Sequence, residues 1–157
     1  MSQAEKSVYL TIAYFVSDPQ TIATLRAAAS REVDVKLLLP GFSDSALVFH
    51  AGRSHYPELI RCGVKIFEHH DAMLHAKTAV IDDVWSTIGS TNMDWRSFLY
   101  NDELNAVVIG EEFALDMERM YNQDIENALQ IDSTQWEASG SVMRLKEWHA
   151  RIWEYWL

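Results

Sequence analysis

A histidine and a lysine separated by one residue, His75 and Lys77, are the side chains in this 157-residue sequence whose types and spacing first suggest chemistry. The surrounding run, HAKTAVID, has the pattern of a strand, and side chains two residues apart on a strand leave the same face. A neutral imidazole can act as a nucleophile or base near neutral pH, and a Lys ammonium is a compact charge for a phosphate oxygen. The pair therefore predicts a site for an anionic, oxygen-rich group.

Two further polar side chains follow a short distance along the chain. Ser90 and Asn92 come just after Gly89 and offer a hydroxyl and an amide at a turn, where backbone N–H groups are also available. These donors suit the equatorial oxygens of a phosphoryl group. A His-x-Lys pair by itself is most simply explained as two polar residues on a solvent-exposed strand without a function. The prediction therefore depends on the pattern as a whole.

The whole pattern is His75-x-Lys77, four residues, Asp82, then Gly89-Ser90-x-Asn92, and it resembles the HxKxxxxD and GSxN motifs of the phospholipase D superfamily. The resemblance implies metal-independent phosphodiester exchange through a phosphohistidine intermediate, with no cofactor. It implies that His75 is a catalytic histidine, that Lys77 and Asn92 hold phosphate oxygens, and that Ser90 lies in the same pocket. Asp82 and Glu103 match acidic supports, Glu103 being the carboxylate that fixes the imidazole tautomer.

The resemblance is closer still to the second half of bacterial cardiolipin synthases. It extends over IAYFVSDPQ, VDVKLLLPG, AGRSHYPELIRCGVKIFE and the run from 73 to 108, which includes DWRSFLYNDELN. This implies transfer of a phosphatidyl group between two phosphatidylglycerol molecules, with water as a competing acceptor. It also implies a peripheral location at the cytoplasmic face of the bacterial inner membrane.

This chain contains one HxKxxxxD motif, whereas enzymes of the superfamily need two. One imidazole must be neutral to attack phosphorus while another is protonated to release the leaving alcohol. We expect the second motif to come from the other half of a longer chain, in which His75 acts as general acid or base. The alternatives are a homodimeric single-motif nuclease or phosphodiesterase, and a half-domain that is idle on its own.

The hydropathy pattern predicts an α/β fold in which a mixed parallel and antiparallel sheet is flanked by helices. The resemblance implies that this fold is a phospholipase D-like half-domain. We expect strands at 8–16, 33–39 and 64–68, connected by helices at 20–31 and 45–61 and therefore parallel. Beyond residue 75 the pattern changes to a hairpin with a two-residue turn at Asp82-Asp83, a strand at 104–109 and a helix at 111–128.

Residues 1–140 are expected to form this domain, and residues 141–157 an amphipathic helix rich in Trp. The tail combines Trp148, Trp153 and Trp156 with basic residues, a mixture that suits the headgroup region of a membrane or a protein interface. Peripheral membrane contact and packing on the missing half therefore both stay open. Arg53 and Tyr56 match a family position lining the approach to the site, and helix packing explains them equally well.

Composition excludes several other classes of protein. The net charge of −10 argues against non-specific binding of nucleic acid, although residues 102–140 alone carry −9 and leave the motif region nearly neutral. The lone Cys62 forms no internal disulfide, which fits a reducing compartment. The sequence holds no apolar run long enough to span a bilayer. A metal cluster at His69, His70, Asp71 and His75 fits no ligand spacing that we can defend.

Overall fold

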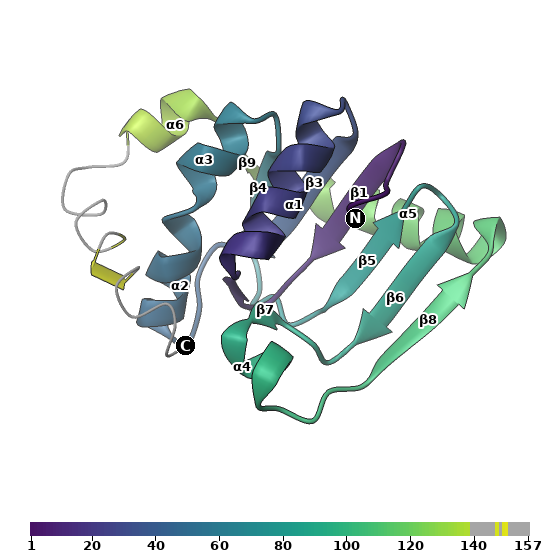
Figure 1. Cartoon of the computed structure of the whole chain (residues 1–157). Helices are drawn as coiled ribbons and strands as arrows, with labels where there is room; N and C mark the ends of the chain where they lie inside the picture. The colour runs from purple at the N-terminus through teal and green to yellow at the C-terminus, as the bar shows by residue number, and fades with distance from the viewer. Residues whose placement is uncertain (139–146, 148, 151–157) are drawn as a thin grey trace.

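The computed structural model describes residues 1–138, 147, 149 and 150, and their centre is a seven-stranded sheet (Figure 1). The strand order is β8-β6-β5-β1-β3-β4-β9, and a separate two-stranded ladder pairs β2 with β7. The sheet contains both parallel and antiparallel pairs, which confirms the predicted fold class. The strands are β1 (Ser7–Thr11), β2 (Phe15–Val16), β3 (Asp34–Pro40), β4 (Lys65–His69), β5 (Thr78–Ile81), β6 (Trp85–Gly89), β7 (Met93–Asp94), β8 (Asn105–Ile109) and β9 (Leu129–Ile131).

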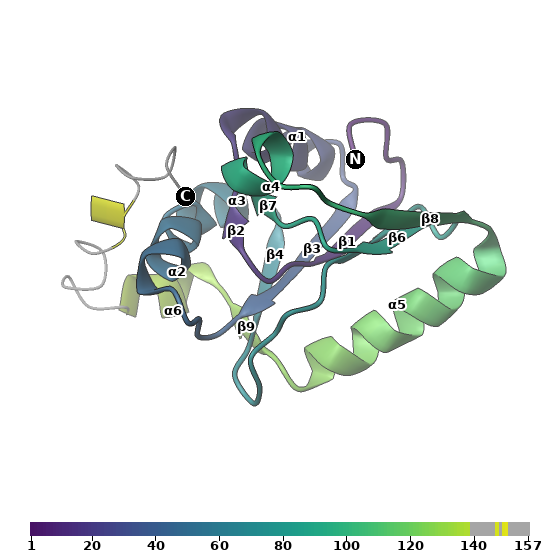
Figure 2. The ribbon, with the colours of Figure 1, turned by 90° about the horizontal axis from the view of Figure 1, so that it is seen from below.

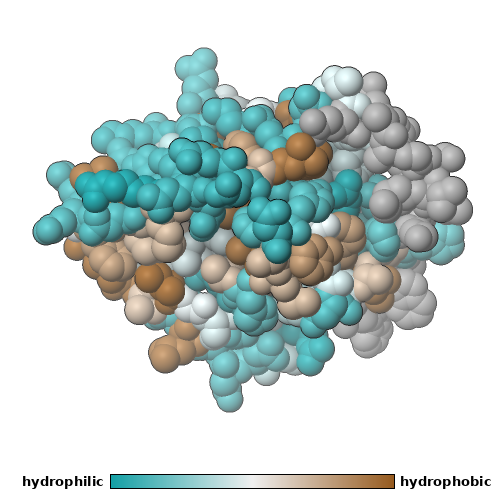
Figure 3. All heavy atoms as spheres, turned by 180° about the vertical axis from the view of Figure 1, so that it is seen from behind, coloured by the Kyte–Doolittle hydropathy of each residue, from teal (hydrophilic) through white to brown (hydrophobic). Residues whose placement is uncertain are grey.

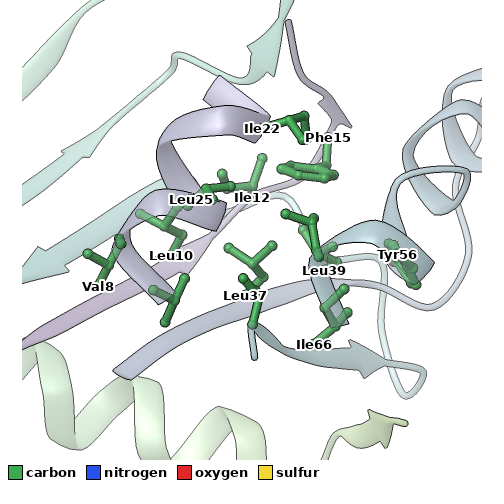
Figure 4. Packing of buried hydrophobic residues seen from close by; sticks show 14 of the residues in the cluster. Val8, Leu10, Ile12, Phe15, Ile22, Leu25, Leu37, Leu39, Tyr56 and Ile66 are labelled. Carbon is green, nitrogen blue, oxygen red and sulfur yellow. The ribbon is translucent and has the colours of Figure 1, made fainter. Parts of the chain in front are cut away.

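The first half of the chain forms the predicted parallel strands β1, β3 and β4. Helix α1 (Pro19–Ser30) connects β2 to β3, and Asp18 begins it by accepting hydrogen bonds from the N–H groups of Gln20 and Thr21. Apolar side chains of α1 and of the three strands interdigitate in the main core (Figure 4), which includes Val8, Leu10, Ile12, Phe15, Ile22, Leu25, Leu37, Leu39, Tyr56 and Ile66.

Helix α5 (Glu111–Glu126) lies along the opposite face of the sheet (Figure 2). Its buried side chains Ala114, Met117 and Tyr121 pack against Tyr9 and Phe67 of the strands. Its outer face is polar, and Figure 3, which views the molecule from behind, shows a broad hydrophilic area with smaller apolar ones. The two faces of the sheet are thus covered by different helices, which agrees with the continuous burial along β1 and along the second half of β3.

Three predicted elements have different bounds in the structure. The strand expected at 8–16 is divided into β1 and β2, because β2 leaves the main sheet to pair with β7. The helix expected at 45–61 is divided into α2 (Ala46–Arg53) and α3 (Tyr56–Arg61), and Pro57, which has no N–H to donate, stands in the first turn of α3. The hairpin turn has three residues, 82–84, rather than two, since Ile81 pairs with Trp85.

The sequence prediction missed four short elements, and one predicted element stays untested. The missed elements are β7, β9, α4 (Trp95–Leu99) and α6 (Ser133–Ala138). The predicted helix at 141–157 lies outside the described residues except for 147, 149 and 150, which are helical. Within the described part of the chain, no helix is long and apolar enough to cross a membrane.

Removal of core volume at Leu37 tests this packing. Leu37 is fully buried between α1 and the sheet, so Leu37→Ala should lower the free energy of unfolding by ~3 kcal/mol in urea denaturation. Leu115→Ala is the matched control on α5, where the leucine is 43% exposed, and its cost should stay within ~0.5 kcal/mol. Equal costs for the two variants would contradict the described core.

Candidate active site

Lys77 lies in the extended segment that leads into β5, just before the strand on which the sequence predicted it. Its side chain is only 9% exposed, and its ammonium donates a hydrogen bond to the backbone oxygen of His75 over 2.8 Å. Burial lowers the pKa of Lys77, although the carboxylates of Glu103 and Asp94 act in the opposite direction. The ammonium is thus a partly desolvated positive charge at the end of the sheet.

Lys77 and Asn92 line one pocket of about 160 Å³, and their predicted role in holding phosphate oxygens stays a prediction. The pocket is lined by Leu10, Ala79, Thr87 and Asn105 from the sheet and by Phe98 from α4. We call it the phosphate pocket. One cation and one amide beside apolar walls provide donors in a site where water competes weakly.

The imidazole of His75 is exposed and lies beside Tyr14, with their ring centroids 6.1 Å apart and their planes at 79°. The backbone N–H of Tyr14 donates to Oδ1 of Asn92 over 3.3 Å. Tyr14 therefore connects the histidine to the phosphate pocket. Sequence reasoning missed Tyr14, because this residue is far from His75 along the chain and only the pairing of β1 with β5 brings the two together.

Ser90 and Glu103 are joined by a hydrogen bond from the serine hydroxyl to Oε2 of the glutamate. That bond is the main reason why the pKa of Glu103 lies below its usual value, and the Asn101 amide donates to Oε1 over 3.3 Å. The described side-chain partners of Glu103 thus include Ser90, Ser97 and Asn101, and its predicted bond to the imidazole stays a prediction. Gly89 has no room for a side chain, because a Cβ there would clash with the Asn105 amide and the Leu104 carbonyl.

Asp82 lies at the far end of β5, five residues and therefore about 16 Å from Lys77 along the strand. Its carboxylate accepts hydrogen bonds from the backbone N–H groups of Glu5, Lys6 and Ser7, the shortest being 2.7 Å. Burial acts to raise its pKa, but these hydrogen bonds outweigh burial and hold the pKa below its ordinary value. The geometry thus makes Asp82 an anchor between the hairpin turn and the start of β1, outside the phosphate pocket.

Comparison with known proteins identifies the family. Residues 1–125 match the family model described as the phospholipase D-like domain of cardiolipin synthase. The chain belongs to that family. It is 34% identical over 154 residues to a cardiolipin synthase of Halalkalibacterium halodurans and 36% identical over 152 residues to one of Geobacillus kaustophilus. These alignments cover 97–98% of this chain but only 29–30% of those relatives, so the chain spans under a third of their length.

Solved structures agree with the fold of this family. The phospholipase D family member Nuc from Salmonella typhimurium superposes with a TM-score of 0.72 and 23% identity, over 84% of this chain and 86% of that one. A phosphatidylserine synthase of Haemophilus influenzae superposes with a TM-score of 0.75 and 12% identity, over 99% of this chain and 42% of that one. At these identities the likeness shows the fold alone.

Arg53, which family resemblance associates with the approach to the site, lies in a buried cluster instead. Its guanidinium forms ion pairs with Glu68 and with Glu147, at 3.3 Å for the latter. It also stacks on the rings of Tyr56 and Trp136 at 5.4 and 5.2 Å. The structure thus favours the packing explanation, in which Arg53 connects α2, β4 and the start of the C-terminal segment.

Among the described residues, no group of three or more His, Cys, Asp and Glu side chains could hold a metal ion. His70, one member of the cluster considered from the sequence, instead lies 3.4 Å from the carboxylate of Glu68. His69 lies at the end of β4 with a buried ring nitrogen. The cluster at 69–75 is therefore not brought together as a metal site within the described part of the chain.

Replacement of Asp82 tests its role as an anchor. Asp82→Asn should lower the free energy of unfolding by ~2 kcal/mol at neutral pH, because charge-assisted bonds to three backbone N–H groups are weakened. Folding lowers the pKa of Asp82 below its ordinary value of 3.8. The variant should therefore show its full loss of stability at pH values above 3.8, and the loss should disappear as the pH falls through the lowered pKa of the folded protein.

Asp83→Asn provides the control for that experiment. Asp83 shares the turn and its left-handed backbone, but its carboxylate makes only a 3.4 Å bond with Ser7 and a 3.6 Å pair with Lys6. Its replacement should change stability by under ~0.5 kcal/mol. If both variants lost the same stability with the same pH profile, the anchoring role of Asp82 would be refuted.

Proposed function

We propose that this chain is the catalytic half of a phosphatidyltransferase that makes cardiolipin from two molecules of phosphatidylglycerol. The observation that carries the proposal is the phosphate pocket, in which Lys77 and Asn92 line one cavity next to the exposed His75. Membership of the cardiolipin synthase family over residues 1–125 supports a lipid phosphodiester as the substrate. No cofactor or metal is required in this scheme.

The reaction is a double displacement through a phosphohistidine. One imidazole attacks the phosphorus of the donor lipid, a P–N bond forms, and the glycerol leaves with a proton from a second imidazole. The primary hydroxyl of the acceptor then attacks phosphorus, the P–N bond breaks, and the second imidazole takes the hydroxyl proton. Lys77, Asn92 and Ser90 hold the phosphoryl oxygens, and Glu103 supports the histidine side of the pocket.

The scheme needs two imidazoles, one as nucleophile and one as general acid and base, so a second HxKxxxxD motif must face the one described. The chain spans under a third of the length of its relatives, which supports a longer natural protein as the source of that motif. We assign His75 the role of general acid and base. A symmetric dimer of this chain is the alternative source of the second histidine.

An exposed apolar surface beside the site supports such a partner. Leu99, Leu104, Val107 and Ile109, on α4, the loop after it and β8, are 54–82% exposed. Helix α1 covers β1 and β3 and does not reach β8 (Figures 1 and 2). Apolar side chains grouped in this way are a feature of interfaces, and we assign this one to a second unit of the same fold, which would bring its motif to the phosphate pocket.

The substrates of this reaction reside in a bilayer, so the enzyme must work at a membrane surface. We place it at the cytoplasmic face of the bacterial inner membrane as a peripheral protein. The Trp-rich residues 141–157 would contribute to contact with lipid headgroups. Nucleic acid is not a substrate in this proposal, and the acidic composition accords with that.

Replacement of His75 tests the chemistry. In the complete protein that holds both motifs, His75→Ala should reduce formation of cardiolipin by about a thousandfold, because loss of a general acid and base costs that order of rate. The measurement is lipid product analysis with phosphatidylglycerol vesicles. His70→Gln is the control, since His70 is half exposed and pairs with Glu68 away from the phosphate pocket, and it should keep nearly all activity.

The chain alone tests the need for a second motif. We expect the 157 residues by themselves to be monomeric in light scattering and inactive on phosphatidylglycerol, and the complete protein to be active. A stable homodimer of the chain that cleaves nucleic acid in the presence of a chelator would refute the lipid proposal in favour of a single-motif nuclease.

A further inference from the structure

A second pocket, of about 340 Å³, adjoins the phosphate pocket and has no role in the scheme so far. Its lining is mainly polar and includes Tyr14, Asp44, Ser45, Asn92, Arg96 and Asn101. Asn92 lines both pockets, so the two form one continuous site with a shared amide. We call the second one the polyol pocket.

The polyol pocket lies where ligands commonly bind in open sheets. Tyr14 follows the end of β1, and Asp44 follows the end of the neighbouring parallel strand β3. The crevice outside the carboxyl ends of parallel strands is a general binding position in α/β folds. In Figure 1 this is the lower edge of the sheet, between the start of α2 and α4.

Tyr14 places the polyol pocket within reach of the reacting groups. Its ring packs edge-on against the imidazole of His75, with centroids 6.1 Å apart, and its hydroxyl donates to Asp44 over 2.8 Å. A ligand bound beside Asp44 and Asn92 is therefore close to both the imidazole and the amide that binds phosphate. The pocket has the position that a second substrate needs.

The side chains around this pocket suit a neutral group with several hydroxyls. Tyr14 and Ser43 both donate to Oδ1 of Asp44, and backbone N–H groups of Asp44 and Ser45 also bond to this carboxylate. The carboxylate is exposed, and its two oxygens together have about four acceptor positions, so it can accept a further bond from a ligand. The hydrogen bond from Tyr14 is also the main cause that lowers the pKa of Asp44, so the group is ionised and repels a phosphate. Asn101 and Ser45 offer an amide and a hydroxyl, and both kinds of group can donate and accept.

Arg96 adds a positive charge at the exposed side of the polyol pocket. A guanidinium forms paired hydrogen bonds with phosphate oxygens. A molecule with a polyol at one end and a phosphodiester next to it would match Asp44 with its hydroxyls and Arg96 with its phosphate. The terminal glycerol of phosphatidylglycerol has this arrangement.

We infer that the polyol pocket binds the glycerol headgroup of the acceptor lipid and thereby favours transfer to glycerol over hydrolysis. The inference rests on the proposed function and names the residues that select its acceptor. In the second displacement, the primary hydroxyl held beside Asp44 attacks phosphorus. The P–N bond to the partner histidine breaks, its electron pair returns to that nitrogen, and His75 takes the hydroxyl proton. Asp44 is a binding residue, and Tyr14 positions it.

The test measures how the complete protein partitions the phosphohistidine between glycerol and water. With phosphatidylglycerol vesicles, Asp44→Asn should lower the ratio of cardiolipin to phosphatidic acid by about tenfold, the effect expected from a lost charge-assisted hydrogen bond. Tyr14→Phe, which keeps the ring beside His75 but loses the hydroxyl, should change the ratio in the same direction. Asp116→Asn, on the exposed face of α5, is the matched control and should leave the ratio unchanged.

A second arm with isotope-labelled free glycerol separates the headgroup from the rest of the lipid. Labelled glycerol should replace the headgroup glycerol of phosphatidylglycerol, because it can take the place of the acceptor lipid. Asp44→Asn should lower the rate of this exchange as well as the rate of cardiolipin formation. If cardiolipin fell but exchange did not, the pocket would recognise another part of the lipid and the inference would be wrong.

The outcomes distinguish the inference from the proposed function. A parent protein that forms both cardiolipin and phosphatidic acid, with the same ratio in Asp44→Asn and Tyr14→Phe, would refute the polyol pocket and leave the proposed function standing. A parent protein that forms neither product would refute both. Thermal unfolding of each variant verifies that the tested proteins are folded. If Asp44→Asn does not fold, Tyr14→Phe alone tests the inference.

Discussion

Strand β1 is hydrogen-bonded on both of its edges, to β3 in parallel and to β5 in the antiparallel sense. This double pairing determines where each part of the site can lie. The parallel side brings the ends of β1 and β3 to one edge of the sheet, and with them Tyr14 and Asp44. The antiparallel side makes β5 begin at that same edge, so that His75 and Lys77 approach it from the opposite chain direction. Two unrelated stretches of sequence thus meet without a long loop.

The same arrangement separates the charges of the molecule. The strongly acidic stretch after the motif includes α5, which lies on the face of the sheet opposite α1. The walls of the phosphate pocket, Leu10 and Ala79, belong instead to the core on the α1 side. The sheet therefore stands between the charges of α5 and Lys77, whereas the carboxylates of Glu103 and Asp94 lie close enough to Lys77 to act on its pKa. A net charge of −10 is compatible with an anionic substrate because the charge is distributed in this way.

The sequence predicted those features that depend on residues near one another along the chain. The runs of apolar residues and the spacing of His75, Lys77 and Asn92 are local features. The structure has the predicted parallel strands, and it places Lys77 and Asn92 in one pocket. Tyr14 and Asp44 could not be found in this way, since only the pairing of β1 with β3 brings them together. The division of the helix at 45–61 was missed although Pro57 marks it, because helical periodicity continues across the break.

Asp82 has a consequence for how such motifs are interpreted. The three best-known positions of the pattern perform two different kinds of work, since His75 and Lys77 lie at the site whereas Asp82 fastens the hairpin to the start of β1. A homologous chain that had lost its histidine but kept this aspartate would still have reason to fold in the same way. A match at this aspartate is thus a statement about architecture. Under the function proposed above, the histidine and the lysine are the positions of the three that decide whether a given protein can be a working enzyme or a pseudoenzyme.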